Sequence, residues 1–430
     1  MSNYPVSIVE NSLPDRPQSD DGSIEDEVPR AAYLHVPFCR RRCFYCDFPV
    51  SVVGDRRHGG NSNTMEAYVE ALCREIQLVG SNIMPLNTVF FGGGTPSLLT
   101  ADQLERILTT VDDRFGIATG AEISIEMDPG TFDLAKLQGY RAAGVNRISL
   151  GVQAFADELL QKCGRSHSVE DIYAAVELLH QSQTDNFSFD LISGLPHQTL
   201  EVWQASLDAA IALAPKHLSV YDLIVEPGTV FDRYYQAGST PLPPDETAAE
   251  MYRLAQQTLT NAGYEHYEVS NYAQPGYPCR HNRTYWHNLP YYGLGMGATS
   301  YVNRQRLTRP RKLQEYYDWL AASEAVGSPV GGEIASAADR LLETLMLGFR
   351  LAEGVNLTEI DRVWGKEAAD GIWRCLLPYR RCGWVEAISA DGNLLDGDAT
   401  VSMVHRLRLN DPEGFLFSNT ILAALFERLG

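Results

Sequence analysis

Short apolar runs alternate with amphipathic segments over the first half of the chain. The runs are rich in Val, Ile and Phe, which is typical of strands that helices bury. They cover residues 31–38, 88–94, 122–129, 147–153, 187–194 and 217–225. Between two of them, apolar positions recur at helical spacing over 104–111, after a capping box formed by Thr100 and Gln103. The alternation predicts a parallel sheet with right-handed crossovers, and six units fit an open, partial (β/α)6 barrel better than the full eight.

The pattern changes on either side of this region. Residues 1–29 are rich in Ser, Pro, Asp and Glu, and predict a disordered acidic tail. From residue 306 onward, amphipathic helical patterns such as 338–355 and 418–430 dominate. We therefore expect a barrel domain over 30–305 and a mainly helical, winged-helix-like C-terminal domain over 306–430.

Composition narrows the classes of partner. The chain has 430 residues, with 35 Lys and Arg against 55 Asp and Glu, and a net charge of −20. Nucleic acid is not expected as a partner, because phosphate binding needs a local excess of basic groups. We also expect no membrane anchor and no export signal, and hence a cytoplasmic protein. In such a reducing compartment, clustered cysteines more often bind metal than form disulfides.

Three of the eight cysteines form a cluster. Cys39, Cys43 and Cys46 lie within eight residues, directly after the first apolar run. The other cysteines are single and are expected to fill the core. These are Cys73, Cys163, Cys279, Cys375 and Cys382.

The cluster admits three interpretations. A zinc site would lack a fourth ligand at the usual spacing, and a redox pair would leave one thiol unexplained. A [4Fe–4S] cluster held by three thiolates leaves one iron open for a small chelating ligand. We favour this third interpretation, and expect the positive charge of Arg40–Arg42 to favour thiolates.

Polar residues and glycines follow the ends of the predicted strands. They are the cysteine loop, Gly92–Thr95, Glu126, Gln153 and Asp190. Such positions are also common where chains simply reverse direction. Because parallel barrels build their sites at the carboxyl ends of strands, we expect these residues to line one cleft.

The spacing C-x3-C-x2-C, with Tyr45 before the last cysteine, resembles the signature of the radical S-adenosylmethionine (SAM) superfamily. The motifs YLHVPFC, FFGGGTPSLL, RISLGVQAF and LISGLPHQT further resemble its coproporphyrinogen III oxidase-like subfamily. The resemblance implies that the amino and carboxylate groups of SAM chelate the open iron. It implies SAM contacts at Tyr33, Tyr45, Gly93, Gly94, Thr95, Glu126, Gln153, Arg165 and Asp190.

Two features separate the branches of this subfamily. Dehydrogenases continue after the third cysteine with Gly and Cys, whereas this chain has Asp47 and Phe48, as in the heme chaperones of the HemW branch. The segment CRHNRTYW (279–286) is similar to a motif of those chaperones that is associated with heme. It implies that His281, Tyr285 and Trp286 bind heme, with Cys279 as a less supported second ligand. The alternative is that His281 is a hydrogen-bonded loop histidine.

The resemblance therefore implies a heme chaperone without substrate turnover, which delivers heme to acceptor hemoproteins such as respiratory cytochromes. The alternative is an oxygen-independent coproporphyrinogen III dehydrogenase, in which reduced cluster cleaves SAM and the substrate loses carbon dioxide. A homodimer and a transient contact at a membrane remain open.

Overall fold

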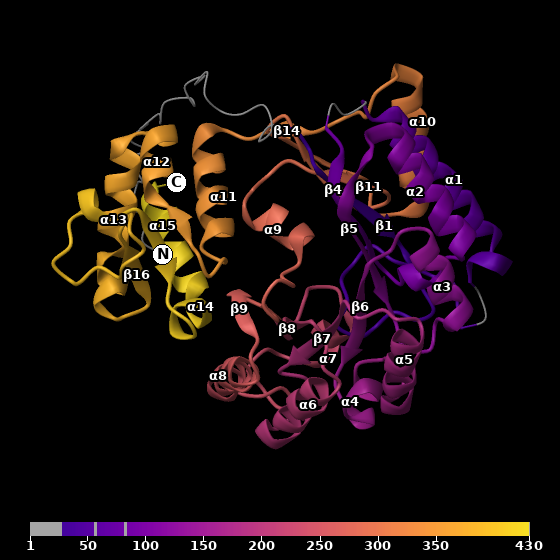
Figure 1. Ribbon diagram of the computed structural model, residues 1–430, viewed down its shortest axis with the longest axis horizontal. Helices are drawn as coiled ribbons and strands as arrows, with labels where there is room; N and C mark the ends of the chain where they lie inside the picture. Colours follow the sequence, from indigo (N-terminus) through magenta and orange to yellow (C-terminus); the bar gives the residue numbers. More distant parts are fainter. Residues whose placement is uncertain (1–27, 56–57, 81–83, 430) are drawn as a thin grey trace, which may run out of the picture. The chain divides into compact units, whose positions relative to one another are not determined.

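The computed structural model of this chain describes residues 28–55, 58–80 and 84–429 (Figure 1). Nearly all of the predicted tail over 1–29 lies outside the described residues. Two compact units divide between Ile334 and Ala335, rather than at the expected boundary between 305 and 306. The reason is strand pairing: β12 (Thr299–Val302), β13 (Gln305–Thr308) and β14 (Glu333–Ile334) form one sheet across that expected boundary.

The first unit is built on a nine-stranded sheet in the order β11-β1-β4-β5-β6-β7-β8-β10-β9. Its six central strands pair in parallel, as predicted. They are β1 (Ala31–Val36), β4 (Leu86–Gly93), β5 (Ile117–Met127), β6 (Arg147–Gln153), β7 (Phe187–Ser193) and β8 (His217–Asp222). One edge gains β11 (Tyr292–Leu294), and the other gains β10 (Asn271–Ala273) and β9 (Glu265–Glu268). The partial six-stranded barrel predicted from the sequence is thus confirmed, with three additional strands at its edges.

Side chains alternate along the central strands between an apolar outer face and a polar inner face. On β7, Phe189 and Leu191 belong to the hydrophobic core, while Ser188 and Asp190 line a cavity inside the sheet. Ser188 lies beside Ser149 of β6 and His217 of β8 in the register of the sheet. The space that the curved sheet encloses, called the lumen below, is therefore polar, whereas the interior of a complete barrel is packed with apolar layers.

Helices cover the outer face of the sheet (Figure 1). The principal ones are α1 (Asn63–Leu78), α2 (Ala101–Phe115), α3 (Leu134–Ala142), α5 (Val169–Gln181), α6 (Leu200–Ala212) and α8 (Asp245–Asn261). At the start of α2, Thr100 and Gln103 form the predicted capping box. None of the helices in the described ranges is long and apolar enough to cross a membrane.

The second unit, from Ala335, combines helices with one small sheet. Its elements are α11 (Ala337–Gly348), β15 (Val355–Asn356), α12 (Leu357–Trp364), α13 (Lys366–Arg381), β16 (Val385–Ile388), β17 (Arg406–Leu409), α14 (Glu413–Leu416) and α15 (Ser418–Leu429). The strands pair antiparallel in the order β15-β17-β16. The order α11, β15, α12 and α13, followed by the hairpin of β16 and β17, is that of a winged helix. The expected mainly helical C-terminal region is thus confirmed.

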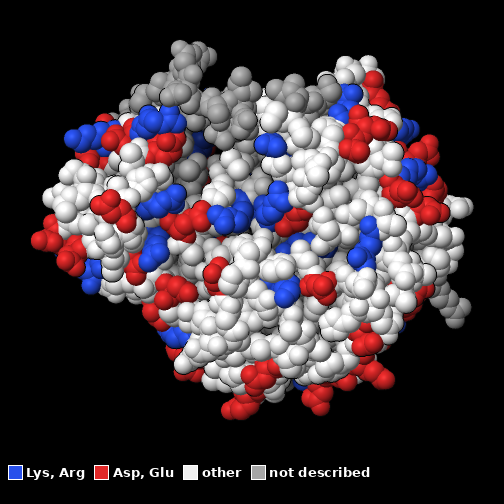
Figure 2. All heavy atoms as spheres, in the orientation of Figure 1, with Lys and Arg blue, Asp and Glu red and all other residues white. Residues whose placement is uncertain are grey.

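The surface carries both signs of charge. On the face shown in Figure 2, acidic and basic side chains are interspersed, although the whole chain has a net charge of −20.

Candidate functional site

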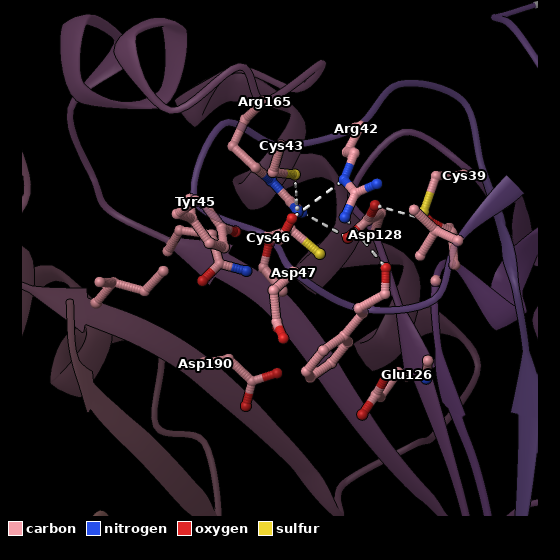
Figure 3. A pocket seen from close by; sticks show the side chains of 18 of the residues that line it. Cys39, Arg42, Cys43, Tyr45, Cys46, Asp47, Glu126, Asp128, Arg165 and Asp190 are labelled. Atoms are coloured by element: carbon pink, nitrogen blue, oxygen red, sulfur yellow. Dashed lines mark hydrogen bonds and ion pairs between the residues drawn. The ribbon is translucent and has the colours of Figure 1, made fainter. Parts of the chain in front are cut away.

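The three clustered cysteines lie on the loop between β1 and α1 and line a pocket of about 430 Å³. The loop is closed at its base by a short parallel pair, β2 (Phe38–Cys39) and β3 (Ser51–Val52). Its middle is held to the rest of the unit where the Phe44 amide donates to the Cys163 carbonyl at 2.9 Å. The cysteines lie on one side of this pocket, across from Glu126 and Asp190 on the strands (Figure 3).

The donor set of three thiols is the one that three corners of an iron–sulfur cluster require. In the described parts of the chain, no three His, Cys, Asp or Glu side chains converge closely enough to hold one metal ion. The irons of a cluster are bound at separate corners, one thiolate each. The pKa of Cys39 is raised to about 12, chiefly by burial and then by Asp128. Iron must displace that proton to bind.

The arginines beside the cysteines contribute mainly to the shape of the loop. Arg42 donates from Nε to the Cys46 carbonyl at 3.1 Å, and from Nη2 to the Phe48 carbonyl at 3.4 Å. Arg41 pairs with Asp55 at the surface. Burial raises the pKa of Cys46, and the lowering effect of Arg42 is smaller. The predicted effect of these arginines on the thiols is therefore present at Cys46, but burial outweighs it.

Two glycines at the end of β4 leave the pocket open beside the cysteine loop. A Cβ on Gly94 would lie 2.7 Å from the Phe38 carbonyl oxygen and 2.9 Å from Cys39 Sγ. Gly93 has φ of +116°, and a Cβ there would lie 2.5 Å from the ring of His35. Its amide donates to Glu126 Oε2 at 3.0 Å. The backbone can approach a ligand at this point because both positions lack side chains.

A partly buried ion pair lies next to the cysteines. Arg165 Nη2 contacts Asp128 Oδ1 at 2.5 Å, and its Nη1 lies 3.4 Å from Cys43 Sγ. Asp128 also accepts a hydrogen bond from Thr95 Oγ1 at 3.2 Å. Sequence reasoning did not single out Asp128, although it belongs to the E-x-D-P-G-T segment at the end of β5. Asp128 orients Arg165, whose planar guanidinium is suited to a carboxylate.

Two further carboxyl groups line the pocket. Burial, with a smaller contribution from the charge of Asp190, raises the pKa of Glu126 to about 8. Burial also raises the pKa of Asp190 to about 6, against hydrogen bonds from Ser219 and Ser149 that lower it. Beside them, Gln153 adopts a positive φ of 68°, a strained backbone of a kind that often occurs at functional sites.

Eight of the nine residues predicted to contact SAM line this pocket. They are Tyr45, Gly93, Gly94, Thr95, Glu126, Gln153, Arg165 and Asp190. Tyr33 lies apart from them, in an adjoining cavity, where its hydroxyl is 3.0 Å from His35 Nδ1. Six of them lie within or directly after β4, β5, β6 and β7, as expected for this architecture, whereas Tyr45 lies on the cysteine loop and Arg165 follows α4 (Asp157–Lys162).

The adjoining cavity, called the lumen cavity here, has a volume of about 200 Å³. Glu126, Asp190, Tyr221 and Phe48 line both this cavity and the cysteine pocket. Its other side is formed by α9 (Arg280–Trp286), which carries the predicted heme motif. The structure thus brings this motif, distant in sequence, next to the cysteine pocket.

Within α9 the predicted heme residues differ in position. His281 and Tyr285 line the lumen cavity, whereas Trp286 is not among its lining residues. The start of α9 is anchored by Glu122, which accepts hydrogen bonds from the amides of Arg280 and His281.

His281 has partners for both of its ring nitrogens. Nδ1 lies 2.8 Å from Thr88 Oγ1, and Nε2 lies 2.8 Å from the Tyr285 hydroxyl. Burial lowers the pKa of His281 to about 3, so the imidazole is neutral. An iron atom would have to replace one of these two hydrogen bonds. Cys279, the second candidate ligand, is buried with its sulfur 3.6 Å from Glu122.

Several lumen residues were missed by sequence reasoning. They are Ser124, Arg147, Ser149, Ser188, His217 and Ser219. The signal that could have revealed them is the alternation of polar and apolar residues in SIE, RIS, SFD and HLS, within strands that were interpreted mainly from their Val, Ile and Phe content.

Comparison with known proteins places this geometry among relatives. The pattern of the Radical SAM superfamily matches residues 33–210. The chain is 51% identical to the heme chaperone HemW of Synechocystis over 94% of this chain and 97% of that protein. It is 33% identical to HemW of Bacillus subtilis, over 93% and 100% of the two chains. The structure of coproporphyrinogen III oxidase (HemN) from Escherichia coli matches with a TM-score of 0.74 at 23% identity, covering 93% and 90% of the two chains. The last match shows a shared fold.

Proposed function

The chain belongs to the HemW family of heme chaperones within the radical SAM superfamily, and from that premise we propose that it binds heme beside a SAM-binding [4Fe–4S] cluster and passes the heme to acceptor hemoproteins. The observation that carries this proposal is the 51% identity to a heme chaperone along 94% of the chain. Asp47 and Phe48, after the third cysteine, agree with it.

In this proposal Cys39, Cys43 and Cys46 hold the cluster. When bound, the cluster supplies an iron with an open coordination position for the amino and carboxylate groups of SAM. Gly93 and Gly94 allow SAM to approach the backbone closely. Arg165, which is held by Asp128, faces the carboxylate of SAM. Glu126 and Asp190 lie on the opposite wall, where they suit the polar groups of the nucleoside.

Heme, the cargo, is proposed to bind where the cysteine pocket and the lumen cavity meet. Phe48 lines both and is 52% exposed, so it offers an apolar face at the entrance. His281 is the proposed iron ligand, after release of its hydrogen bond to Tyr285. The cavity of about 200 Å³ is too small for a porphyrin ring, so the ring stays outside and His281 reaches its iron through a rearrangement of α9.

The test is an anaerobic heme titration of the cluster-reconstituted full chain without SAM, followed by absorption in the Soret region. We expect saturable binding of one heme per chain, and transfer of that heme to an apocytochrome. His281→Ala should weaken binding about tenfold or more if its imidazole binds the iron. His287→Ala, on the exposed end of the same segment, is the matched control and should bind as the unmodified chain does.

A parallel assay with coproporphyrinogen III separates chaperone from dehydrogenase. We expect no 5′-deoxyadenosine formed in step with protoporphyrinogen. Stoichiometric formation of both, without heme binding, would overturn the proposal and establish the enzyme.

A further inference from the structure

We propose that the lumen cavity is a binding site for a carboxylate group, with Arg147 as its anchor. The site lies inside the sheet, beneath the cysteine pocket and beside α9. The inference deepens the proposed function, and rests on it for the identity of the ligand: the carboxylate is either a propionate arm of heme or a free small carboxylic acid.

Arg147 is a buried cation that forms no ion pair within the described residues. It begins β6 and is 3% exposed, and it lines the lumen cavity. Its Nη1 donates to the Asn186 side chain at 3.4 Å and to the Tyr277 carbonyl at 3.2 Å. Both of these acceptors are neutral, and no ion pair joins Arg147 to a carboxylate of the described residues. Buried charges are normally paired, so an anion supplied from outside would complete this site.

Two further polar groups in the cavity lack partners. Ser124 is 1% exposed, and its hydroxyl has no hydrogen-bond partner among the described residues. The same holds for Nδ1 of His217, which is also 1% exposed. In the register of the sheet Ser124 lies beside Arg147, and Nε2 of His217 lies 2.8 Å from the Tyr267 hydroxyl. When that hydroxyl donates to Nε2, Nδ1 carries a proton and becomes a donor.

These groups together match a carboxylate. A guanidinium, a hydroxyl and an imidazole N–H supply donors for its two oxygens. Burial raises the pKa of Asp190 and the charge of Arg147 lowers it, but no ion pair joins the two side chains. Asp190 accepts hydrogen bonds from Ser149 Oγ at 3.0 and 3.2 Å, at the end of the cavity shared with the cysteine pocket. Burial keeps Glu126 largely protonated near neutral pH, because its pKa is raised to about 8.

Size and access restrict the ligand. Drug-sized ligands usually occupy about 300–1,000 Å³, and this cavity measures about 200 Å³. It therefore fits one short acid or one arm of a larger molecule. The shared residues Phe48, Glu126 and Tyr221 place its entrance at the proposed heme position, so an arm of a bound heme can enter while the ring remains outside.

The experiment compares heme with its dimethyl ester, in which both propionates are blocked. Both are titrated without SAM, in the same dilute detergent, into the cluster-reconstituted full chain and into Arg147→Gln. We expect the unmodified chain to bind heme about tenfold to a hundredfold more tightly than the diester. Arg147→Gln should lose this preference and bind the two alike, while Arg147→Lys should restore part of it. Arg141→Gln, the same change on the exposed face of α3, should keep the preference in full.

The outcomes separate this inference from the proposed function. Equal binding of heme and diester by the unmodified chain would overturn a propionate site while leaving heme binding intact. If the chain binds neither porphyrin, the proposed function fails, and sodium propionate titrated calorimetrically then tests the cavity itself. If the unmodified chain and Arg141→Gln bind propionate and Arg147→Gln does not, the result supports a site for a free acid. If the unmodified chain does not bind propionate, the inference is overturned. Should Arg147→Gln fail to fold, Ser124→Ala, which removes one donor, is read in the same way.

Discussion

At Gly94 the backbone after β4 passes so close to the cysteine loop that a methyl group has no room. The atoms in the way are the Phe38 carbonyl and Cys39 Sγ, which belong to the strand end and the first predicted cluster ligand. A backbone oxygen cannot rotate aside as a side chain can. The residue at position 94 therefore controls the place of a cysteine that is far from it in sequence.

We predict that Gly94→Ala displaces Cys39 and weakens the site. Overpacking of this kind costs about 1–3 kcal/mol. Where this cost falls on the SAM-bound state, the dissociation constant of SAM rises about 5- to 150-fold. Iron content after anaerobic reconstitution and equilibrium dialysis with SAM measure the effect. Gly397→Ala is the control, since a Cβ there meets nothing within 4 Å. Full iron loading with unchanged SAM affinity in Gly94→Ala would contradict the prediction.

At the scale of elements, a buried ion pair joins α1 to the segments that follow the barrel. Glu75 of α1 contacts Arg309 Nε at 2.7 Å, with both side chains almost fully buried. It also accepts hydrogen bonds from the Tyr316 hydroxyl on α10 (Leu313–Val326) at 2.7 Å and from the Gly295 amide at 2.8 Å. This network explains why residues beyond 305 belong to the first compact unit, although the sequence pattern there is already helical.

Removal of the Glu75 charge should destabilise the first unit. Breaking one partner of a buried pair typically costs about 3–5 kcal/mol, because the other charge remains buried alone. We expect Glu75→Gln to lose that much free energy of unfolding in urea. Glu70→Gln, exposed on the same helix, should change it by less than about 0.5 kcal/mol. Equal stability of the two variants would show that the pair contributes nothing.

At the scale of the whole barrel, two binding regions share one wall. Glu126, Asp190 and Tyr221 line both the cysteine pocket and the lumen cavity. A ligand in the pocket of about 430 Å³ therefore covers groups that face the second cavity. Two ligands that use the same side chains are coupled in free energy, and the coupling is reciprocal.

We predict that SAM and heme weaken each other's binding to the cluster-loaded chain. The dissociation constant of heme should rise about fivefold or more at saturating SAM, and that of SAM should rise by the same factor with heme. Titrations of each ligand in the presence and absence of the other measure both factors. Identical affinities in all four titrations would mean that the two regions act independently.

Much of the architecture and part of the site were predictable from local signals. The six parallel strands, the capping box at Thr100 and the cysteine loop each depend on residues close together in the chain. Asp128 and Arg147 were missed for different reasons. Asp128 acts through Arg165, a partner from a later crossover, and Arg147 begins a strand whose inward direction depends on the register of its neighbours.

The family, the order of strands and helices and the three thiols could be established from the amino-acid sequence, because periodicity and motif spacing are properties of neighbouring residues. Four features became visible only once the chain was folded. They are the position of α9 against the lumen, the partners of both nitrogens of His281, the place of Tyr33 outside the cysteine pocket, and the burial of Arg147 without an ion pair among the described residues. These facts depend on contacts between residues such as Thr88 and His281, 193 positions apart. Burial and pairing arise when distant segments pack, and the pattern of one segment does not record what will cover it.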